Sequence, residues 1–449
     1  MRPPAGWSSE RLPPPTSLLR VDLRGERRGL VGDCHRLDAP VSWSSSSTAL
    51  SGPTLFQVED IQVKHCARIT ASAFTSPGDV CDYRIMAEEN EWRAIGERLR
   101  RTRLIAGMSQ AELGKPVGLD RTMVAKIEAG ARRISALELT QLSAALDVPI
   151  GYLLEPVPEV VSRRGSAVDE DFDSAVAKES GRLEIVLAAW LSDLRQLIEL
   201  GVLRPRPLLT AKQQADSAAS AREIALWARG ALGCQLDPVN SMVEVCERAG
   251  QFVLVTEVPG EGAAAIDGDI AAAVVSLHGD PGRRRSTAAH ELGHLVLGDE
   301  YSNDLGVHAS RPDRENVIDE FAAEFLLPSP VLASIGANGI SRGQLVEVAA
   351  RYRVSWSLAL RQAVRSGVLD AESQRAMARN RPTRSEFLDA LGWSPQPDLE
   401  SVRVPPGYAH AVLEALRMAA ITPSRAVELL HGQAGLADLP ADDEADDEP

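Results

Sequence analysis

The chain has 449 residues, which is too long for a single hydrophobic core and predicts about three domains. The composition is that of a globular protein, with 44% hydrophobic and 25% charged residues, and the net charge of -15 excludes a protein that coats nucleic acid along its whole length. Five cysteines without a Cys-x-x-Cys pair exclude a disulfide framework and a cysteine zinc cluster. Because no run of about 18 apolar residues and no signal-peptide pattern is present, we expect a cytoplasmic, nucleoid-associated protein without membrane contact.

The ends of the chain and one internal stretch lack the patterns of a folded domain. Residues 1–88 are rich in Pro, Ser and Arg, and we predict a disordered extension, with Met86 as an alternative start of the protein. The charged stretch 156–218 is predicted to be a linker with one helix, at Leu183–Leu203. The acidic tail, 433–449, is expected to be disordered.

The region 89–155 combines short helical patterns with glycine turns. Ser109 is a suitable N-cap for a helix that begins at Gln110, and Asp120 is a suitable N-cap for the next, Arg121–Glu128. Two short helices joined by a glycine turn place the second so that its outer face can enter a DNA major groove. Residues 95–154 carry nine basic and six acidic residues, hence a net charge of +3, as contact with phosphates requires.

Three runs in this region, Ser109–Leu113, Val117–Leu119 and Ile127–Gly130, resemble the Xre (Cro and lambda-repressor type) helix-turn-helix family. The resemblance implies a five-helix domain that binds a double-stranded DNA operator, and we expect a homodimer. Pro116 departs from the family pattern and is expected to fray the end of its helix. A small helical bundle for protein contacts is the alternative. The residues predicted to contact DNA are Gln110, Arg121, Thr122, Lys126, Arg132 and Arg133.

A second motif, His290-Glu291-Leu292-Gly293-His294, indicates a metal site. The two histidines are four residues apart on a predicted helix, so both can bind one metal. Glu291 is not spaced to be a ligand, and its usual role in this motif is to accept a proton from water and pass it to the leaving amine. A purely structural site has no need of Glu291. Gly293 is expected to let another backbone pass closely.

A catalytic zinc takes three protein ligands and keeps one position open. The third ligand should come from the next predicted helix, about Arg314–Leu327, where Glu315 and Asp319 share a face. One of them can bind the metal while the other orients a histidine. Tyr301 and His308 can also serve an oxyanion, but we assign them no role. The acidic candidates on that helix are Glu315, Asp319, Glu320 and Glu324.

The stretch Glu315–Pro328 resembles the ImmA/IrrE-type metallopeptidases, in which Glu-x-x-Ala-(Asn or Asp)-x-Phe-Ala is followed by Leu-Leu-x-Pro or similar. The resemblance implies a zincin-like α+β domain at 219–335 with a small sheet. It also implies Zn2+ as cofactor, with Mn2+ as an alternative, Glu315 as the third ligand and Asp319 as the orienting residue. Ile318 replaces the usual alanine, which puts the packing behind the metal in doubt. The elements expected before the motif are helices at Ala221–Leu232 and Val239–Ala249 and strands at Phe252–Thr256 and Ala271–Leu277.

The sequence thus predicts a mainly α multidomain protein with C-terminal helices at 336–432, which form a packing or dimerisation module or a second DNA-binding pair. Members of the peptidase family cleave Xre-type repressors. We therefore expect a transcriptional regulator with a zinc endopeptidase that cuts such a repressor, an antitoxin-like protein or its own linker near Arg163-Arg164. The alternatives are a non-catalytic metal or ligand sensor, a metal-binding domain that no longer cuts, and an antitoxin-like binding protein.

Overall fold

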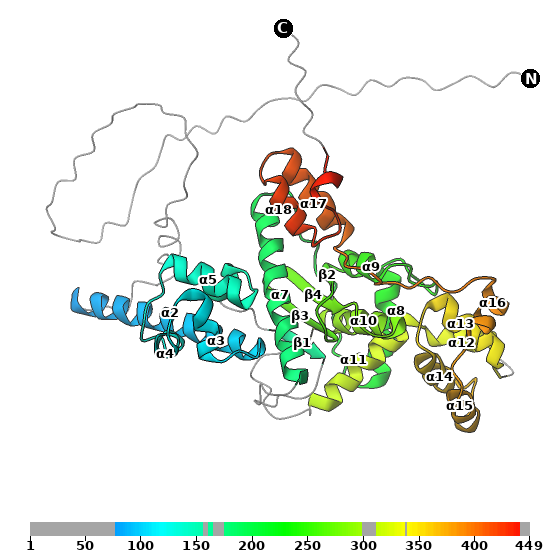
Figure 1. Ribbon diagram of the computed structural model, residues 1–449. Coiled ribbons are helices and arrows are strands. Elements are labelled where there is room, and N and C mark those ends of the chain that lie inside the picture. The colour runs from blue at the N-terminus through cyan, green and yellow to red at the C-terminus, as the bar shows by residue number, and fades with distance from the viewer. Residues whose placement is uncertain (1–76, 156–159, 165–174, 299–310, 337–338, 441–449) are drawn as a thin grey trace, which may run out of the picture. The chain divides into compact units, whose positions relative to one another are not determined.

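The computed structural model describes residues 77–155, 160–164, 175–298, 311–336 and 339–440 (Figure 1). The described chain is mainly helical and contains one small sheet, as the sequence predicts. The predicted disordered extension up to residue 76 and the acidic tail from residue 441 lie outside the described residues. None of the described helices combines the length and the apolar character that are needed to cross a membrane.

The N-terminal domain contains five α-helices and one 3-10 turn, as the helix-turn-helix resemblance implies. They are α2 (Pro77–Ile105), α3 (Gln110–Gly114), η1 (Lys115–Val117), α4 (Arg121–Glu128), α5 (Ala136–Leu146) and α6 (Ile150–Leu154). Residues 77–88 were predicted to be disordered, but they are helical. Met86 lies inside α2. A proline suits the first turn of a helix, and none follows Pro77 within α2. Pro116 lies in η1, so α3 gives way to a tighter turn where fraying was expected.

The sheet has four strands in the order β1-β3-β4-β2. The strands are β1 (Val160–Arg164), β2 (Gln251–Thr256), β3 (Gly262–Asp267) and β4 (Ile270–Ser276). β2 pairs in parallel with β4, whereas β3 is antiparallel to both β4 and β1. The sequence predicts β2 and β4 but not the other two. Three consecutive alanines in β3 have low strand propensity, which explains why this strand was missed.

Helices cover both faces of the sheet (Figure 1). Successive strand residues point to opposite faces, so Val253 and Val275 enter one hydrophobic core while Phe252 and Val274 enter the other. The first core is completed by α8 (Ala218–Ala231), α9 (Met242–Arg248), α10 (Pro281–Leu297) and α11 (Arg311–Leu326). The second is completed by α7 (Ala175–Glu199), α17 (Pro406–Arg417) and α18 (Pro423–Leu429).

Of the predicted linker at 156–218, the described residues 160–164 and 175–218 contain the one expected helix, α7, and also the strand β1. β1 joins the sheet, and α7 packs on it with Trp190 fully buried and its indole N–H donating to the carbonyl of Phe252 at 3.0 Å. The second hydrophobic core therefore includes residues of α7. The expected helix at Leu183–Leu203 begins earlier, at Ala175, and ends at Glu199.

The C-terminal helices divide between the two cores and do not form one separate module. α12 (Ser329–Ile335), α13 (Arg342–Tyr352) and α14 (Trp356–Arg365) extend the first core, and α15 (Ala371–Ala378) and α16 (Arg384–Leu391) follow them. Leu345 and Leu360 are buried, and Arg353 donates to the carbonyl of Asn240 at 2.7 Å, which favours the packing role over a second DNA-binding pair. A short 3-10 turn, η2 (Leu436–Asp438), lies in the predicted tail, so residues 433–440 are ordered.

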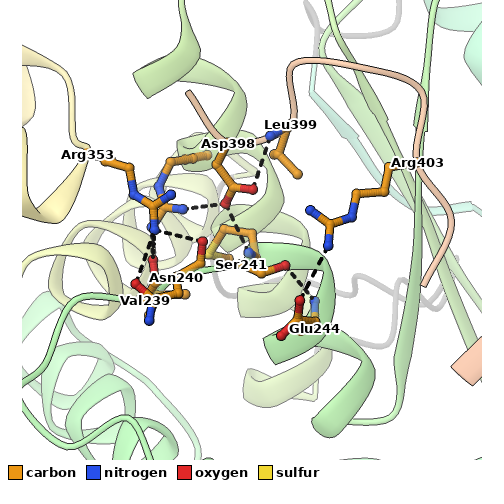
Figure 2. A network of polar contacts seen from close by, with 10 residues as sticks. Val239, Asn240, Ser241, Glu244, Arg353, Asp398, Leu399 and Arg403 are labelled. Atoms are coloured by element: carbon orange, nitrogen blue, oxygen red, sulfur yellow. Dashed lines mark hydrogen bonds and ion pairs between the residues drawn. The ribbon is translucent and has the colours of Figure 1, made fainter. Parts of the chain in front are cut away.

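A buried ion pair ties the segment after α16 to the start of α10 (Figure 2). Arg285 donates to Asp398, whose carboxylate also accepts the backbone N–H of Met242 at 3.0 Å and of Leu399 at 3.1 Å. Burial lowers the pKa of the Arg285 guanidinium to about 10, although Asp398 acts in the opposite direction. Because Arg285 and His290 lie on the same helix, this pair helps to fix the helix that carries the metal motif.

Replacing Asp398 by alanine is expected to lower the free energy of unfolding by about 3–5 kcal/mol, because it leaves the buried Arg285 charge without its partner. The matched control is Glu244→Ala, which removes an exposed pair with Arg403 and should cost about 0–1 kcal/mol. Urea unfolding followed by tryptophan fluorescence measures both values. Equal losses in the two variants would show that the Arg285–Asp398 pair has no special role.

Candidate metal centre and DNA-binding surface

Helices α10 and α11 bring the three predicted metal ligands together. His290 Nε2 lies 3.2 Å from His294 Nε2 and 3.1 Å from Glu315 Oε2, and the three groups offer ligand atoms within 4.8 Å of one another. Two ligand atoms at about 2.0–2.1 Å from a tetrahedral zinc lie about 3.3 Å apart, so these separations fit one zinc ion. Both histidines are 1% exposed, whereas the Glu315 side chain is 31% exposed, so the group opens to solvent on the Glu315 side.

Asp319 contacts His290. Its Oδ1 lies 2.9 Å from His290 Nδ1 on the opposite side of the ring from the ligand atom. With the proton on Nδ1 donated to Asp319, the lone pair of Nε2 would be available to a metal. Glu315 and Asp319 therefore take the positions that the sequence predicts for a ligand and its support.

The other two acidic candidates on α11 belong to different contacts. Glu320 forms ion pairs with Arg222 at 3.1 Å and with Arg365. Glu324 is fully buried and accepts the backbone N–H of Ser329 at 2.8 Å and the amide of Gln362 at 3.0 Å. Both carboxylates stabilise the packing around α11 and lie outside the candidate metal group.

Glu291 is fully buried, and neither of its carboxylate oxygens has a hydrogen-bond partner among the described residues. A buried carboxylate without partners costs several kcal/mol, so packing alone does not account for it. Gly262, at the start of β3, lies against this group: a Cβ atom there would be 3.0 Å from Glu291 Oε1. A glycine at this position therefore leaves room for the carboxylate beside the sheet.

Gly293 allows α10 and α11 to approach closely, although the contact differs from the expected backbone. A Cβ atom at Gly293 would lie 2.9 Å from Ile318 Cγ2 and 3.0 Å from Phe321 Cδ1, which are side-chain atoms. Ile318 itself is fully buried. The replacement of the family's usual alanine by Ile318 is thus accommodated next to Gly293.

Two supports of the site have no signature in the sequence. Gln251, in β2, donates its side-chain amide to the backbone carbonyl of Glu291 at 3.0 Å. Gly262 provides the space described above. Both act across long sequence separations, which a local pattern does not reveal. Tyr301 and His308 lie outside the described residues.

A cavity of about 780 Å³ borders the site on the side of Asp319. Residues from α10 and α14 line it, among them Ser286, Trp356 and Arg361. The cavity therefore offers space for a bound molecule next to the Asp319 carboxylate that contacts His290.

The predicted DNA-binding residues fall into two groups. Arg121, Thr122 and Lys126 are on α4, where the hydroxyl of Thr122 donates to Asp120 at 2.6 Å. Arg121, Thr122 and Lys126 are all exposed. Arg133, which follows α4, is exposed as well. These side chains are accessible to a DNA backbone or groove.

The side chains of Gln110 and Arg132 bind other residues of the domain. The side-chain amide of Gln110 donates to Glu128 at 2.8 Å, and Glu128 in turn accepts from the buried Arg103 at 2.6 Å. Arg132 pairs with Glu138 at 2.7 Å, and this hydrogen bond is the largest of the effects that lower the pKa of Glu138 to about 2. A DNA contact by either residue would therefore have to share these partners.

Comparison with known protein families finds matches in two different parts of the chain. Residues 99–153 match the family model described as helix-turn-helix, and residues 246–363 match the one described as IrrE N-terminal-like domain. The second match runs from α9 to α14, past the boundary at 335 that the sequence predicts.

The relatives found share only a short stretch with this chain. An uncharacterized HTH-type transcriptional regulator of Sinorhizobium fredii is 40% identical over 65 residues, 14% of this chain and 46% of that protein. One of Sinorhizobium medicae is 36% identical over 64 residues, with the same shares. The chain thus spans less than half the length of these relatives. A crystal structure of Bacillus thuringiensis PlcR with the peptide PapR7 and DNA, 12% identical over 75% of this chain and 91% of that one, has a TM-score of 0.15 and supports no argument.

Proposed function

We propose that this chain, which contains a helix-turn-helix domain at 99–153 and an IrrE N-terminal-like domain at 246–363, is a DNA-binding transcriptional regulator with a zinc-dependent endopeptidase. The similarity to HTH-type transcriptional regulators supports the regulatory part. The observation that carries the enzymatic part is Glu291, a buried carboxylate without partners among the described residues that stands between two histidines of a candidate metal group.

The donor set fits zinc, which accepts two imidazole nitrogens and one carboxylate oxygen from His290, His294 and Glu315. When bound, zinc polarises the scissile carbonyl and lowers the pKa of the attacking water. Asp319 holds the proton of His290 on Nδ1, so that Nε2 remains a ligand. Glu291 accepts a proton from the attacking water at its carboxylate and passes it to the nitrogen of the leaving amine.

The proposed substrates follow from the combination of domains. The ImmA/IrrE resemblance implies cleavage of Xre-type repressors, and the helix-turn-helix domain of this chain is of that type. A partner repressor, an antitoxin-like protein and the chain's own segment near Arg163 are therefore the substrates to test. A regulator of this kind acts in the cytoplasm, and we expect it to bind its operator as a homodimer.

The direct test is incubation of the zinc-loaded full chain alone and with Xre-type repressors, followed by mass spectrometry of the fragments. Cleavage at defined bonds supports the proposal. If the chain binds zinc and never cuts itself or any repressor, even when a proline in β1 weakens the pairing of that strand with β3, the endopeptidase assignment is wrong.

The cavity beside Asp319 favours a second candidate function, in which the peptidase-like domain senses a metal or small ligand without cleavage. A bound molecule there would lie next to the orienting carboxylate of the metal group. This alternative predicts that zinc changes the affinity for DNA while every chain remains intact.

For DNA binding, Lys126→Ala and Arg121→Ala are each expected to weaken binding to a random-sequence duplex and to reduce the salt slope by about 1, because both side chains reach solvent on α4. Fluorescence anisotropy at several salt concentrations measures both effects. Arg100→Ala is the control, since Arg100 lies on α2 and pairs with Glu97 at 3.3 Å. If it weakens binding as much as the α4 variants, α4 is not the DNA-binding surface.

A further inference from the structure

The strand β1 covers the outer edge of β3. Its residues pair antiparallel with that strand, with Ser162 opposite Ala264, Arg163 opposite Ala263 and Arg164 opposite Gly262. The other edge of β3 is taken by β4, so β1 occupies the edge at which another chain could add a strand. Extended peptides commonly bind proteins in this way, through main-chain hydrogen bonds to a sheet edge.

The register of the β1–β3 pairing places one end of β1 near the candidate active site. Arg164, at the C-terminal end of β1, is opposite Gly262, and Gly262 is the residue that lies against the carboxylate of Glu291. A chain paired with β3 in this direction therefore runs toward Glu291. An extended protein segment that follows the same path would bring a peptide bond toward that carboxylate.

We propose that β1 occupies the position of the substrate strand, so that the chain blocks its own active site until β1 leaves the edge of β3. This inference rests on the proposed endopeptidase function. The substrate class is an extended segment of a protein, recognised by main-chain pairing with β3. Because α6 ends at Leu154 and β1 begins at Val160, a movement of the DNA-binding domain can act directly on the blocking strand.

Because β1 is covalently connected to the rest of the chain, it is a strong competitor of a free peptide for the edge of β3. β1 lies between α6 and α7, both part of folded units, so its effective concentration at the edge of β3 is in the range of about millimolar. A free peptide must therefore overcome an intramolecular strand. Weakening β1 should increase the apparent affinity for such a peptide by about tenfold or more.

Adjacent proline substitutions provide a matched pair of variants. Successive N–H groups of a strand point to opposite sides, so only one of Ser162 and Arg163 donates toward β3. Proline removes the N–H, and Ser162→Pro and Arg163→Pro should therefore differ in their effect on the pairing. Equal zinc content and equal circular dichroism verify that both variants fold.

Binding is measured by fluorescence anisotropy with a labelled peptide that copies residues 157–168, in a Glu291→Gln background that prevents cleavage. We expect one proline variant to bind this peptide about tenfold more tightly than the parent and the other to bind like the parent. If the parent and both proline variants bind the peptide alike, or if none of them binds it, β1 does not occupy a substrate edge.

A measurement without mutation of β1 gives an independent answer. In the same Glu291→Gln chain, hydrogen exchange at 162–164 should be slow and should accelerate when the unlabelled peptide saturates the edge. Unchanged exchange would overturn the proposal. These readouts do not depend on catalysis. Tight peptide binding by the proline variant, without cleavage when its Glu291 is intact, refutes the endopeptidase alone. Cleavage without displacement of β1 by the peptide refutes only the role of β1.

Discussion

Glu291→Gln is expected to bind zinc like the parent and to lose cleavage by a factor of about 10² to 10⁴. Glutamine retains the size of the side chain in a site where the residue is fully buried, but it cannot accept a proton from water. The ligand group His290, His294 and Glu315 is unchanged by the substitution. Zinc content is measured by mass spectrometry of the metal, and cleavage by the rate at which fragments form.

Glu347→Gln is the control for this comparison. Glu347 is an acidic residue of α13 that pairs with Arg351 at 2.6 Å on the surface, and its loss should leave the cleavage rate unchanged. Two outcomes contradict the proposed role of Glu291. Either the Glu291→Gln variant cuts at the parental rate, which excludes Glu291 as the base, or neither the parent nor the proline variant with weakened β1 pairing ever cuts, which favours the sensor function.

The helix-turn-helix part was predictable because its determinants are local. Ser109 accepts the backbone N–H of Glu112 at 3.2 Å, and Asp120 accepts that of Met123 at 2.8 Å, as the capping patterns predict. Caps and glycine turns act over three or four residues, so they can be recognised in the sequence. The contact of Gln110 with Glu128 connects two helices and was not predictable in this way.

The metal group was predictable for a similar reason. The two histidines share a face of one helix, and the positions of Glu315 and Asp319 follow a motif within the next. Their supports come from distant strands and loops. The hydrogen bond of Gln251, the space at Gly262 and the ion pair of Asp398 arise only when the chain has folded.

The stretch 156–218 was predicted as a linker with one helix, and this helix, α7, belongs to a folded core for a physical reason. Charged and proline-containing segments border α7, and such segments are typical of linkers. The apolar face of α7 nevertheless has a partner, the sheet face that carries Phe252 and Val274. A strand buried on both faces requires helices on both sides, so a second covering layer could have been expected from the continuous apolar run in β4.

The metal group itself is tested by removing one ligand and one support. Glu315→Ala deletes a ligand atom and should weaken zinc binding by more than about 100-fold, while Asp319→Ala, which only releases His290 Nδ1, should weaken it by about 10- to 100-fold. Competition with a chromophoric chelator measures both affinities. Glu320→Ala is the matched control on the same helix, because Glu320 pairs with Arg222 and Arg365 and should leave zinc affinity unchanged. A ranking in which Asp319→Ala exceeds Glu315→Ala would exchange the roles of the two carboxylates, and an effect of Glu320→Ala as large as theirs would mean that α11 is perturbed as a whole.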